Sequence, residues 1–263
     1  MFRALYTAAS GMSAQDLNLE NIANDLANAN TTGYRRRRLQ FEDLVYQNLV
    51  VPGSAMTQQT TVPSGLQVGL GTRSASSEVI TSQGNLVQTN NPLDIAVQGH
   101  GFFQVLTPSG QIAYTRDGSF HLNQNRQIVT SDGNPVQPAI TIPANALTIS
   151  IGSDGTVTVT EPNQNQAAQV GAVQLALFPN SGGLLNIGNN LYIPTTASGD
   201  PITGTPGSAQ GFGTLQQGMV EQSNVNVVDE FIQMILAQRS YESNSKVVQA
   251  ANQMFQELNN LPQ

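Results

Sequence analysis

The sequence contains no cysteine, no tryptophan and a single lysine among its 263 residues. Without cysteine, disulfides, thiolate metal sites, iron–sulfur clusters and cysteine nucleophiles are all excluded. Charged residues are also scarce, at 10% of the chain against the usual quarter. Polarity comes instead from 25 asparagines and 28 glutamines. Surfaces that are polar yet nearly uncharged can pack against copies of themselves, so the composition indicates self-assembly.

The few charges are mostly negative, with 17 acidic residues against 10 basic ones and a net charge of −7. This balance argues against a general affinity for nucleic acid or an anionic membrane. The apolar runs are too short to span a membrane. The N-terminal stretch from Arg3 to Ser10 is too short and too polar for a secretory signal. We therefore expect a cytoplasmic protein, or one exported without a cleaved signal peptide.

The first thirty residues predict an amphipathic helix of about 27 residues, because apolar positions recur every three and four residues as far as the turn residues before Gly33. Asparagines at helical spacing form a second stripe beside this seam. Asparagine favours a helix only weakly, so we expect these asparagine side chains to bind partners. The seam consists of Leu5, Ala8, Met12, Gln15, Leu19, Ile22, Leu26 and Ala29, and the amide stripe of Asn18, Asn21, Asn24 and Asn28.

The C-terminal forty residues predict a second helix, of about 33 residues, which Asn226 can cap and which runs to about Leu258. Its apolar stripe drifts around the helix instead of keeping to one seam. A long helix with apolar groups on more than one face needs more than one neighbour in water. The apolar positions are Val228, Phe231, Ile232 and Ile235, followed by Val247, Val248, Ala251, Met254, Phe255 and Leu258.

Between the helices, from about residue 73 to residue 222, the pattern changes to alternating strands separated by Asp-Gly and Pro-Ser-Gly turns. An all-β domain is therefore expected inside the sequence of a helical one. Residues 46–72 carry no charge and no helical periodicity, which indicates either disorder or an extended arm ordered by a partner. The turn and stiffening positions of this arm are Pro52, Gly53, Pro63 and Gly65.

Motifs of enzyme chemistry are missing: there is no G-x-S-x-G, no H-E-x-x-H and no phosphate-binding loop before the lysine. The pair Gly69 and Gly71 lacks a strand-then-helix frame and is interpreted as a turn. His100 and His121 lie in predicted hairpins without a third ligand at metal spacing. We therefore expect no catalytic residue, no cofactor and no metal.

Four of the nine arginines follow one another directly after the first helix. Nucleic-acid or lipid-headgroup binding is one interpretation of such a run. In an acidic chain, pairing with carboxylates within or between subunits is the expectation we retain, because arginine is the bidentate partner. The run consists of Arg35, Arg36, Arg37 and Arg38.

Stretches at both ends and in the middle of the chain resemble the flagellar basal-body rod and hook family. The N-terminal signature covers Asn24 to Arg35, and the C-terminal one covers Ser223 to Val228 and Ala237 to Glu242. Gly99 to Val105 and Tyr114 to Phe120 are similar to motifs of the family's β domain. The resemblance covers nearly the whole chain.

Within the family, length and the segments Thr60 to Gly69 and Ile142 to Leu147 are most similar to members of the distal rod. Two positions depart from the family pattern. Asp25 stands where asparagine is usual, and Arg126 replaces a turn glycine. The first departure could alter a lateral amide contact, and the second requires a non-glycine turn or a hairpin one residue different.

The resemblance implies an α+β fold, in which long terminal helices form a coiled-coil-like domain and an antiparallel β domain and an extended arm are inserted. The expected divisions are residues 1–33 with 224–263 as the helical core, 34–72 as linker and arm, and 73–223 as the outward-facing β domain. It also implies a hollow helical polymer that acts as a drive shaft, whose subunits leave through the flagellar type III export apparatus. The implied partners are further copies of the chain, proximal rod proteins, hook protein and the surrounding P and L rings.

The assembly interface expected from the terminal helices includes both apolar and polar positions. It comprises Leu5, Met12, Leu19, Ile22, Asn24, Leu26 and Asn28 of the first helix and Val228, Ile232, Ile235, Arg239, Tyr241, Val248 and Phe255 of the second. A proximal rod or hook-type subunit is the alternative within the family. A β-rich module that binds peptidoglycan or another carbohydrate is the alternative from another class, disfavoured by the lack of tryptophan. A hydrolase would need paired carboxylates, which nothing in the sequence indicates.

Overall fold

The computed structural model describes residues 2–53, 63–162 and 167–259 and divides into two compact units. The first, here called the helical unit, comprises Met1–Leu26, Arg37–Glu78 and Asn226–Gln263. The second, the β unit, comprises Ala27–Arg36 and Val79–Val225. The β unit is thus assembled from a short segment behind the first helix and a long segment in front of the second.

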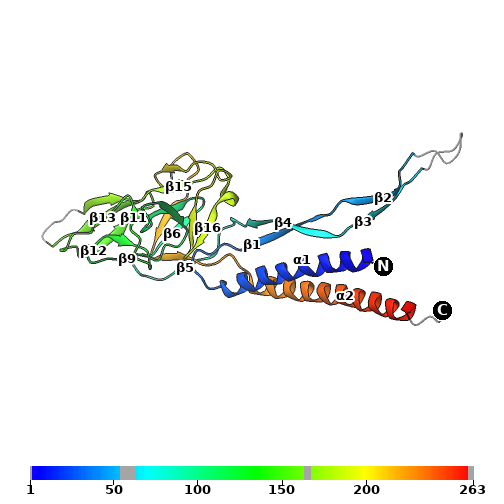
Figure 1. The fold of residues 1–263 in the computed structure, drawn as a ribbon. Helices are drawn as coiled ribbons and strands as arrows, with labels where there is room; N and C mark the ends of the chain where they lie inside the picture. The colour runs from blue at the N-terminus through cyan, green and yellow to red at the C-terminus, as the bar shows by residue number, and fades with distance from the viewer. Residues whose placement is uncertain (1, 54–62, 163–166, 260–263) are drawn as a thin grey trace. The chain divides into compact units, whose positions relative to one another are not determined.

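Two long helices dominate the helical unit. Helix α1 spans Phe2–Ala27 and helix α2 spans Val227–Asn259. They run antiparallel and lie side by side, as both views of the ribbon show (Figure 1). The side chain of Asn226 accepts a hydrogen bond from the Val228 N–H at 3.1 Å, so it caps α2 as its sequence position predicts. The two terminal helices expected from periodicity are confirmed.

The α1–α2 seam follows the heptad spacing of a coiled coil. Ala8 and Ile22 of α1 and Ala237 and Ala251 of α2 are almost inaccessible to solvent. At the open end of the pair, the rings of Phe2 and Phe255 lie 5.3 Å apart. Small residues at the buried positions let the two backbones approach closely. The buried and half-buried positions of α2 are Glu230, Met234, Ala237, Asn244, Ser245, Val248, Ala251 and Phe255.

Two separate strand pairs complete the helical unit. Strand β1 (Arg37–Asp43) pairs with β4 (Thr72–Val79), and β2 (Tyr46–Val50) pairs with β3 (Leu66–Gly69). The β2–β3 pair is antiparallel, with Tyr46 opposite Gly69. The chain between these two strands includes residues 54–62, which lie outside the described residues.

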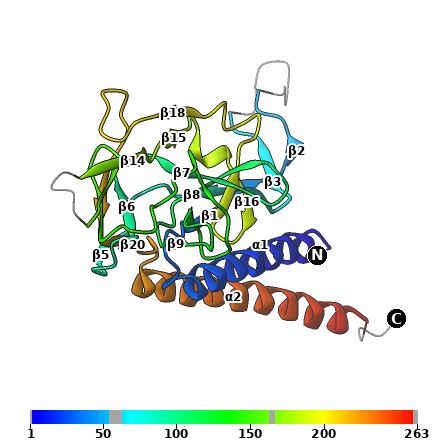
Figure 2. The same ribbon diagram turned by 90° about the vertical axis from the view of Figure 1, so that its left-hand side faces the viewer.

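The β unit is built around a sheet whose strands follow the order β16, β17, β8, β7, β15, β18, with β11 added against β7. Figure 2 shows β7 and β8 together near the middle of the unit. All its pairings are antiparallel. The strands are β7 (Phe102–Leu106), β8 (Ile112–Thr115), β11 (Val136–Gln137), β15 (Leu175–Leu177), β16 (Leu185–Gly188), β17 (Leu191–Ile193) and β18 (Ile202–Gly204).

Smaller sheets surround this one. Strands β12, β13 and β14 form a three-stranded sheet, and three antiparallel pairs join β19 to β6, β20 to β5 and β10 to β9. A one-turn 3₁₀ helix spans Ser181–Gly183. The bounds are β5 (Leu86–Gln88), β6 (Ile95–Gln98), β9 (His121–Leu122), β10 (Ile128–Val129), β12 (Thr148–Ile151), β13 (Thr156–Thr160), β14 (Ala168–Ala172), β19 (Thr214–Gln217) and β20 (Met219–Glu221).

A large apolar core holds the β unit together, and a smaller apolar cluster includes Tyr114 and Phe178. Phe103 and Phe120 meet edge to face with ring centroids 5.1 Å apart, and both are inaccessible to solvent or nearly so. Along β13, burial alternates residue by residue, with Val157 and Val159 in the core. This is the period-two pattern of the sequence. The α+β fold class, with antiparallel strands between terminal helices, is therefore confirmed.

The turn at Arg126 resolves one of the two family departures. Arg126 adopts a left-handed backbone with φ of 57°, and its N–H donates to the Asn123 carbonyl at 2.9 Å. The guanidinium donates to the Pro143 carbonyl at 2.8 Å. The hairpin therefore keeps a turn conformation that glycine would adopt more easily, with arginine in its place.

Candidate functional site

The face of α2 opposite the α1 seam is apolar and exposed to solvent. Five large apolar residues occupy it over less than three turns, at spacings of three, four, seven and eight residues that bring them together on one side. Their exposed fractions lie between 47% and 65%. The set, here called the α2 face, is Val228, Phe231, Ile232, Ile235 and Leu236. A contiguous apolar patch of this kind marks an interaction surface.

The predicted interface residues divide between the seam and the exposed surface. Ile22 is buried in α1, while Asn24 is exposed. The half-buried positions are Leu5, Met12, Leu19 and Leu26 of α1, Asn28 just after it, and Val248 and Phe255 of α2; the exposed ones are Val228, Ile232, Ile235, Arg239 and Tyr241. The drift of the C-terminal stripe thus corresponds to two faces of α2, one against α1 and one open.

Part of the amide stripe of α1 binds the backbone of β1. The Asn21 amide donates to the Arg37 carbonyl at 2.8 Å. The two carboxylate oxygens of Asp25, which is only 1% exposed, accept the Arg37 N–H at 3.2 and 3.3 Å. These two side chains attach the start of β1 to α1. Asp25, unusual in its family, therefore acts as a backbone acceptor, a role that an asparagine oxygen could also fill.

The arginine run reaches several different partners. Arg35 pairs with Glu221 at 2.8 Å, with both side chains buried. Arg38 pairs with Glu78 at 2.9 Å, with both side chains well exposed. The Arg36 N–H donates to the Asn224 side-chain oxygen at 2.8 Å. One member of the run thus forms a buried ion pair and another a surface pair, which contribute very differently to stability.

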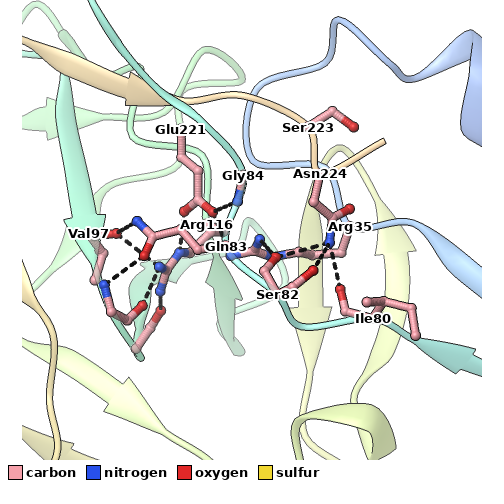
Figure 3. A network of polar contacts seen from close by, with 12 residues as sticks. Arg35, Ile80, Ser82, Gln83, Gly84, Val97, Arg116, Glu221, Ser223 and Asn224 are labelled. Atoms are coloured by element: carbon pink, nitrogen blue, oxygen red, sulfur yellow. Dashed lines mark hydrogen bonds and ion pairs between the residues drawn. The ribbon is translucent and has the colours of Figure 1, made fainter. Parts of the chain in front are cut away.

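Arg35, Arg116 and Glu221 form a buried charged cluster in the β unit (Figure 3). One carboxylate oxygen of Glu221 accepts from Arg35 and from the Gly84 N–H at 2.8 Å. The other accepts from Arg116 Nε at 2.6 Å. The three side chains are only 5%, 3% and 1% exposed, in the order Arg35, Arg116 and Glu221. Burial lowers the pKa of Arg116, the charge of Glu221 opposes that shift, and repulsion from Arg35 adds to it.

Backbone carbonyls complete the surroundings of Arg116. Its terminal nitrogens donate to the carbonyls of Val97, Gly99 and Gly101. Gly99 and Gly101 have φ of 103° and 137°, which side chains rarely allow. A Cβ on Gly101 would also come within 3.0 Å of Leu175. The two glycines therefore let this loop wrap its carbonyls around one guanidinium.

Asn224 links three separated segments of the β unit beside this cluster (Figure 3). Its amide donates to the carbonyls of Ile80 and Ser82 at 2.9 and 3.0 Å, while its oxygen accepts from the Arg36 N–H. The Gly33 N–H donates to the Glu221 carbonyl at 2.7 Å. The segment behind α1, the segment behind β4 and the segment before α2 are thus joined within one polar network.

Sequence reasoning did not anticipate this cluster. Arg116 and Asn224 lie within the family motifs, but their partners are 105 and up to 188 residues away along the chain. Glu221 carries no local signal that distinguishes it from acidic residues in turns. Pairings between side chains so far apart are set by the fold and leave no short-range pattern.

The β2–β3 hairpin has apolar residues with no cover within the described part of the chain. Val45, Tyr46, Leu49, Val51 and Leu66 are each at least half exposed. At its described end, a Cβ on Gly65 would lie 2.5 Å from the Pro52 ring, so glycine is required for that close approach. Pro52, Gly53 and Pro63 are exposed. A two-stranded hairpin without a covering layer is marginally stable by itself.

Neither a metal site nor a membrane span is found among the described residues. The search of that part of the chain gives no group of three or more potential metal-binding side chains. No helix within it is long and apolar enough to cross a membrane. His100 and His121 are both exposed.

Three family models match the sequence, at its start, middle and end. The flagella basal body rod protein model matches residues 5–35, and the flagellar hook protein FlgE/F/G D1 domain model matches residues 96–159. The flagellar basal body rod FlgEFG protein C-terminal model matches residues 216–261. The first and last matches include α1 and α2, and the middle one lies in the β unit.

Full-length relatives share up to half of the sequence. The flagellar basal-body rod protein FlgG of Buchnera aphidicola subsp. Baizongia pistaciae is 50% identical over 98% of this chain and 99% of its own. FlgG of Caulobacter vibrioides is 50% identical over 97% of each chain. FlgG of Bacillus subtilis is 38% identical over 99% of each chain. These similarities extend over both units.

Proposed function

The chain belongs to the FlgG group of flagellar basal-body rod proteins, and from this premise we propose that it polymerises through the open faces of its terminal helices. It is a structural subunit of the distal rod and not an enzyme. The observation that carries the proposal is the α2 face, whose five apolar residues are about half exposed. In water such a surface is stabilised by covering it.

Covering this surface contributes to the free energy of assembly. Fully burying a large aliphatic or aromatic side chain gains about 1.5–3 kcal/mol. Since these five side chains are already about half buried, each side chain would contribute about 1 kcal/mol when a neighbouring subunit covers it. Every subunit in the interior of a polymer makes such contacts on more than one side, so the contributions add along the shaft.

A contact between two different surfaces of the chain favours a helical polymer over a closed dimer. The α2 face would pack against a surface of the next subunit that is not its own copy. A contact between unlike surfaces that does not close into a ring generates an open helix. Repeating it would place α1 and α2 in an inner layer, and a shaft of this kind can be hollow. Such a tube could transmit torque and pass exported subunits.

The β2–β3 hairpin is proposed as a second contact between subunits. Its exposed apolar residues gain stability when a neighbouring chain covers them. The segment from residue 46 to residue 72 has no charge that would oppose such packing. We assign to it the role of a brace that keeps the rod straight and stiff. The part formed by residues 54–62 lies outside the described residues.

The remaining partners follow from a place in the distal rod. The proposed partners are proximal rod proteins at one end, hook protein at the other, and the P and L rings around the shaft. The chain would cross the periplasm as part of this shaft and would leave the cell body unfolded through the flagellar type III export apparatus. A subunit exported unfolded and without a cleaved signal peptide would fold at the growing tip, because only there do its helices gain their full set of contacts.

The position in the rod is tested by electron microscopy of basal bodies isolated from a strain that lacks this gene. We expect truncated rods without their distal part and without outer rings. Complete rods with rings but no hook would instead assign the chain to the hook. Intact flagella would contradict the proposal altogether.

A further inference from the structure

The buried charged cluster of the β unit carries an excess positive charge. Two guanidinium groups, those of Arg35 and Arg116, share the single carboxylate of Glu221. All three groups are at most 5% exposed. An unbalanced charge away from water is unfavourable unless a further group compensates it. Among the described contacts, no other carboxylate of the β unit bonds to either arginine, so none balances the excess positive charge directly.

A small cavity lies directly against this cluster. Its volume is about 100 Å³, and both Arg35 and Arg116 contribute to its wall. Thr81, His100 and Ser181 also line it, together with Phe178. A cavity of this volume has room for several waters or one small polyatomic ion.

Arg35 has hydrogen-bond donors to spare at this wall. Among the described contacts, its guanidinium donates to the Ser82 carbonyl and to Glu221. A guanidinium has five N–H groups, and these contacts use two of them. Arg116, in contrast, uses its donors on Glu221 and three backbone carbonyls. Any ligand would therefore be held by Arg35, with Arg116 contributing its charge.

We propose that this cavity is a binding site for one small oxyanion group, a carboxylate or an inorganic sulfate or phosphate. Such a group carries the missing negative charge, fits the volume, and offers the planar or tetrahedral oxygens that a guanidinium binds bidentately. The site lies wholly within the β unit and makes no use of the α2 face. Its occupant is either a free ion or the carboxylate of another subunit.

Inorganic sulfate is the probe for the first test, on the purified full-length protein. Millimolar sulfate is titrated against chloride at constant ionic strength, and backbone amide shifts are followed by NMR. We expect saturable, one-to-one shifts confined to residues 81–82, 99–102 and 181, together with the Arg35 side chain. Low concentrations avoid the general stabilising action of sulfate on folded proteins.

A matched pair of substitutions supplies the control. Thr81 is exposed, so the fold tolerates replacement. Thr81→Glu brings a carboxylate to the cavity mouth and should weaken sulfate binding about tenfold or more, because two anions would then share the site. Thr81→Gln has the same size without the charge and should bind sulfate within about threefold of the unmodified protein. Linear shifts without saturation, or equal responses of both variants, would overturn the proposal.

The two sources of the oxyanion are distinguished in cells. If a free ion fills the cavity, the Thr81→Glu strain builds rods of normal length. If another subunit supplies the carboxylate, Thr81→Glu competes with it and rods become fewer or shorter, while Thr81→Gln leaves them normal. Either result supports the site once sulfate binding is saturable.

Discussion

Glu221 supplies the one carboxylate that pairs with both buried guanidinium groups of the β unit, those of Arg35 and Arg116. A buried ion pair is a poor source of stability compared with an apolar pair, yet removal of one partner leaves a charge without compensation. Its carboxylate also accepts the Gly84 N–H, and its backbone carbonyl accepts the Gly33 N–H. Loss of the carboxylate would therefore disturb the three segments that contain Arg35, Gly84 and Arg116.

Glu221→Gln should lower the free energy of unfolding by about 3–5 kcal/mol, because glutamine keeps the shape but leaves two positive charges unpaired. Urea denaturation of the purified protein measures this. Glu78→Gln is the control, since its pair with Arg38 is exposed and should change stability by less than about 1 kcal/mol. Equal effects of the two substitutions would show that the buried cluster is not critical.

Asp154 gives a prediction on pH. The hydroxyl and N–H of Thr156 donate to its carboxylate and lower its pKa. A lowered pKa in the folded state means that this contribution to stability is present above the ordinary pKa of aspartate and is lost as the pH falls through the lowered value. Thr156→Ala removes the hydroxyl donor and should raise the pKa of Asp154 in an NMR titration. An unchanged pKa would assign the shift to another cause.

Among single residues, the sequence was most informative where the backbone conformation alone determines which residue is allowed. A non-glycine turn at Arg126 was one of two outcomes it allowed, and the structure shows it with φ of 57°. For Asp25 the sequence indicated only a departure from the family pattern. Its partner is the backbone N–H of Arg37, which no side-chain pattern could reveal.

At the scale of elements, the helices were predictable and most strand partners were not. The cap predicted at Asn226 places the start of α2 to within a residue of its observed start. The alternating segments predict strands and local hairpins such as β7–β8 and β12–β13. Pairings such as β6 with β19 join residues more than a hundred positions apart, and only the closed core selects them.

Before assembly, the backbone amides of the helices should be less protected from hydrogen exchange than those of the β unit. In the unassembled subunit, the α2 face has no cover and few long-range contacts stabilise the helix pair, so its amide hydrogens should exchange faster than those of β7 and β8. In isolated rods the same amides should be protected by packing. Hydrogen exchange with mass spectrometry compares the two states. Equal protection in both would show that the helices gain nothing from assembly.

For the whole molecule, the arm and the helices have separate proposed roles. Deletion of most of residues 46–72 removes the proposed brace and leaves α1, α2 and the β unit in place. We expect rods that still assemble but bend, because only the helix contacts then set the angle between subunits. Electron microscopy of isolated basal bodies measures the curvature. An unchanged straight rod would contradict the role of the arm.

Assembly through the α2 face is the central claim, and one measurement tests it most directly. A strain lacking the gene is supplied with the chain carrying Ile232→Asp and Ile235→Asp, or with the control Gln233→Asp on the same helix but outside the α2 face. Basal bodies are then examined by electron microscopy. The account predicts truncated rods for the double variant and complete rods for the control, whereas complete rods from the double variant would contradict it.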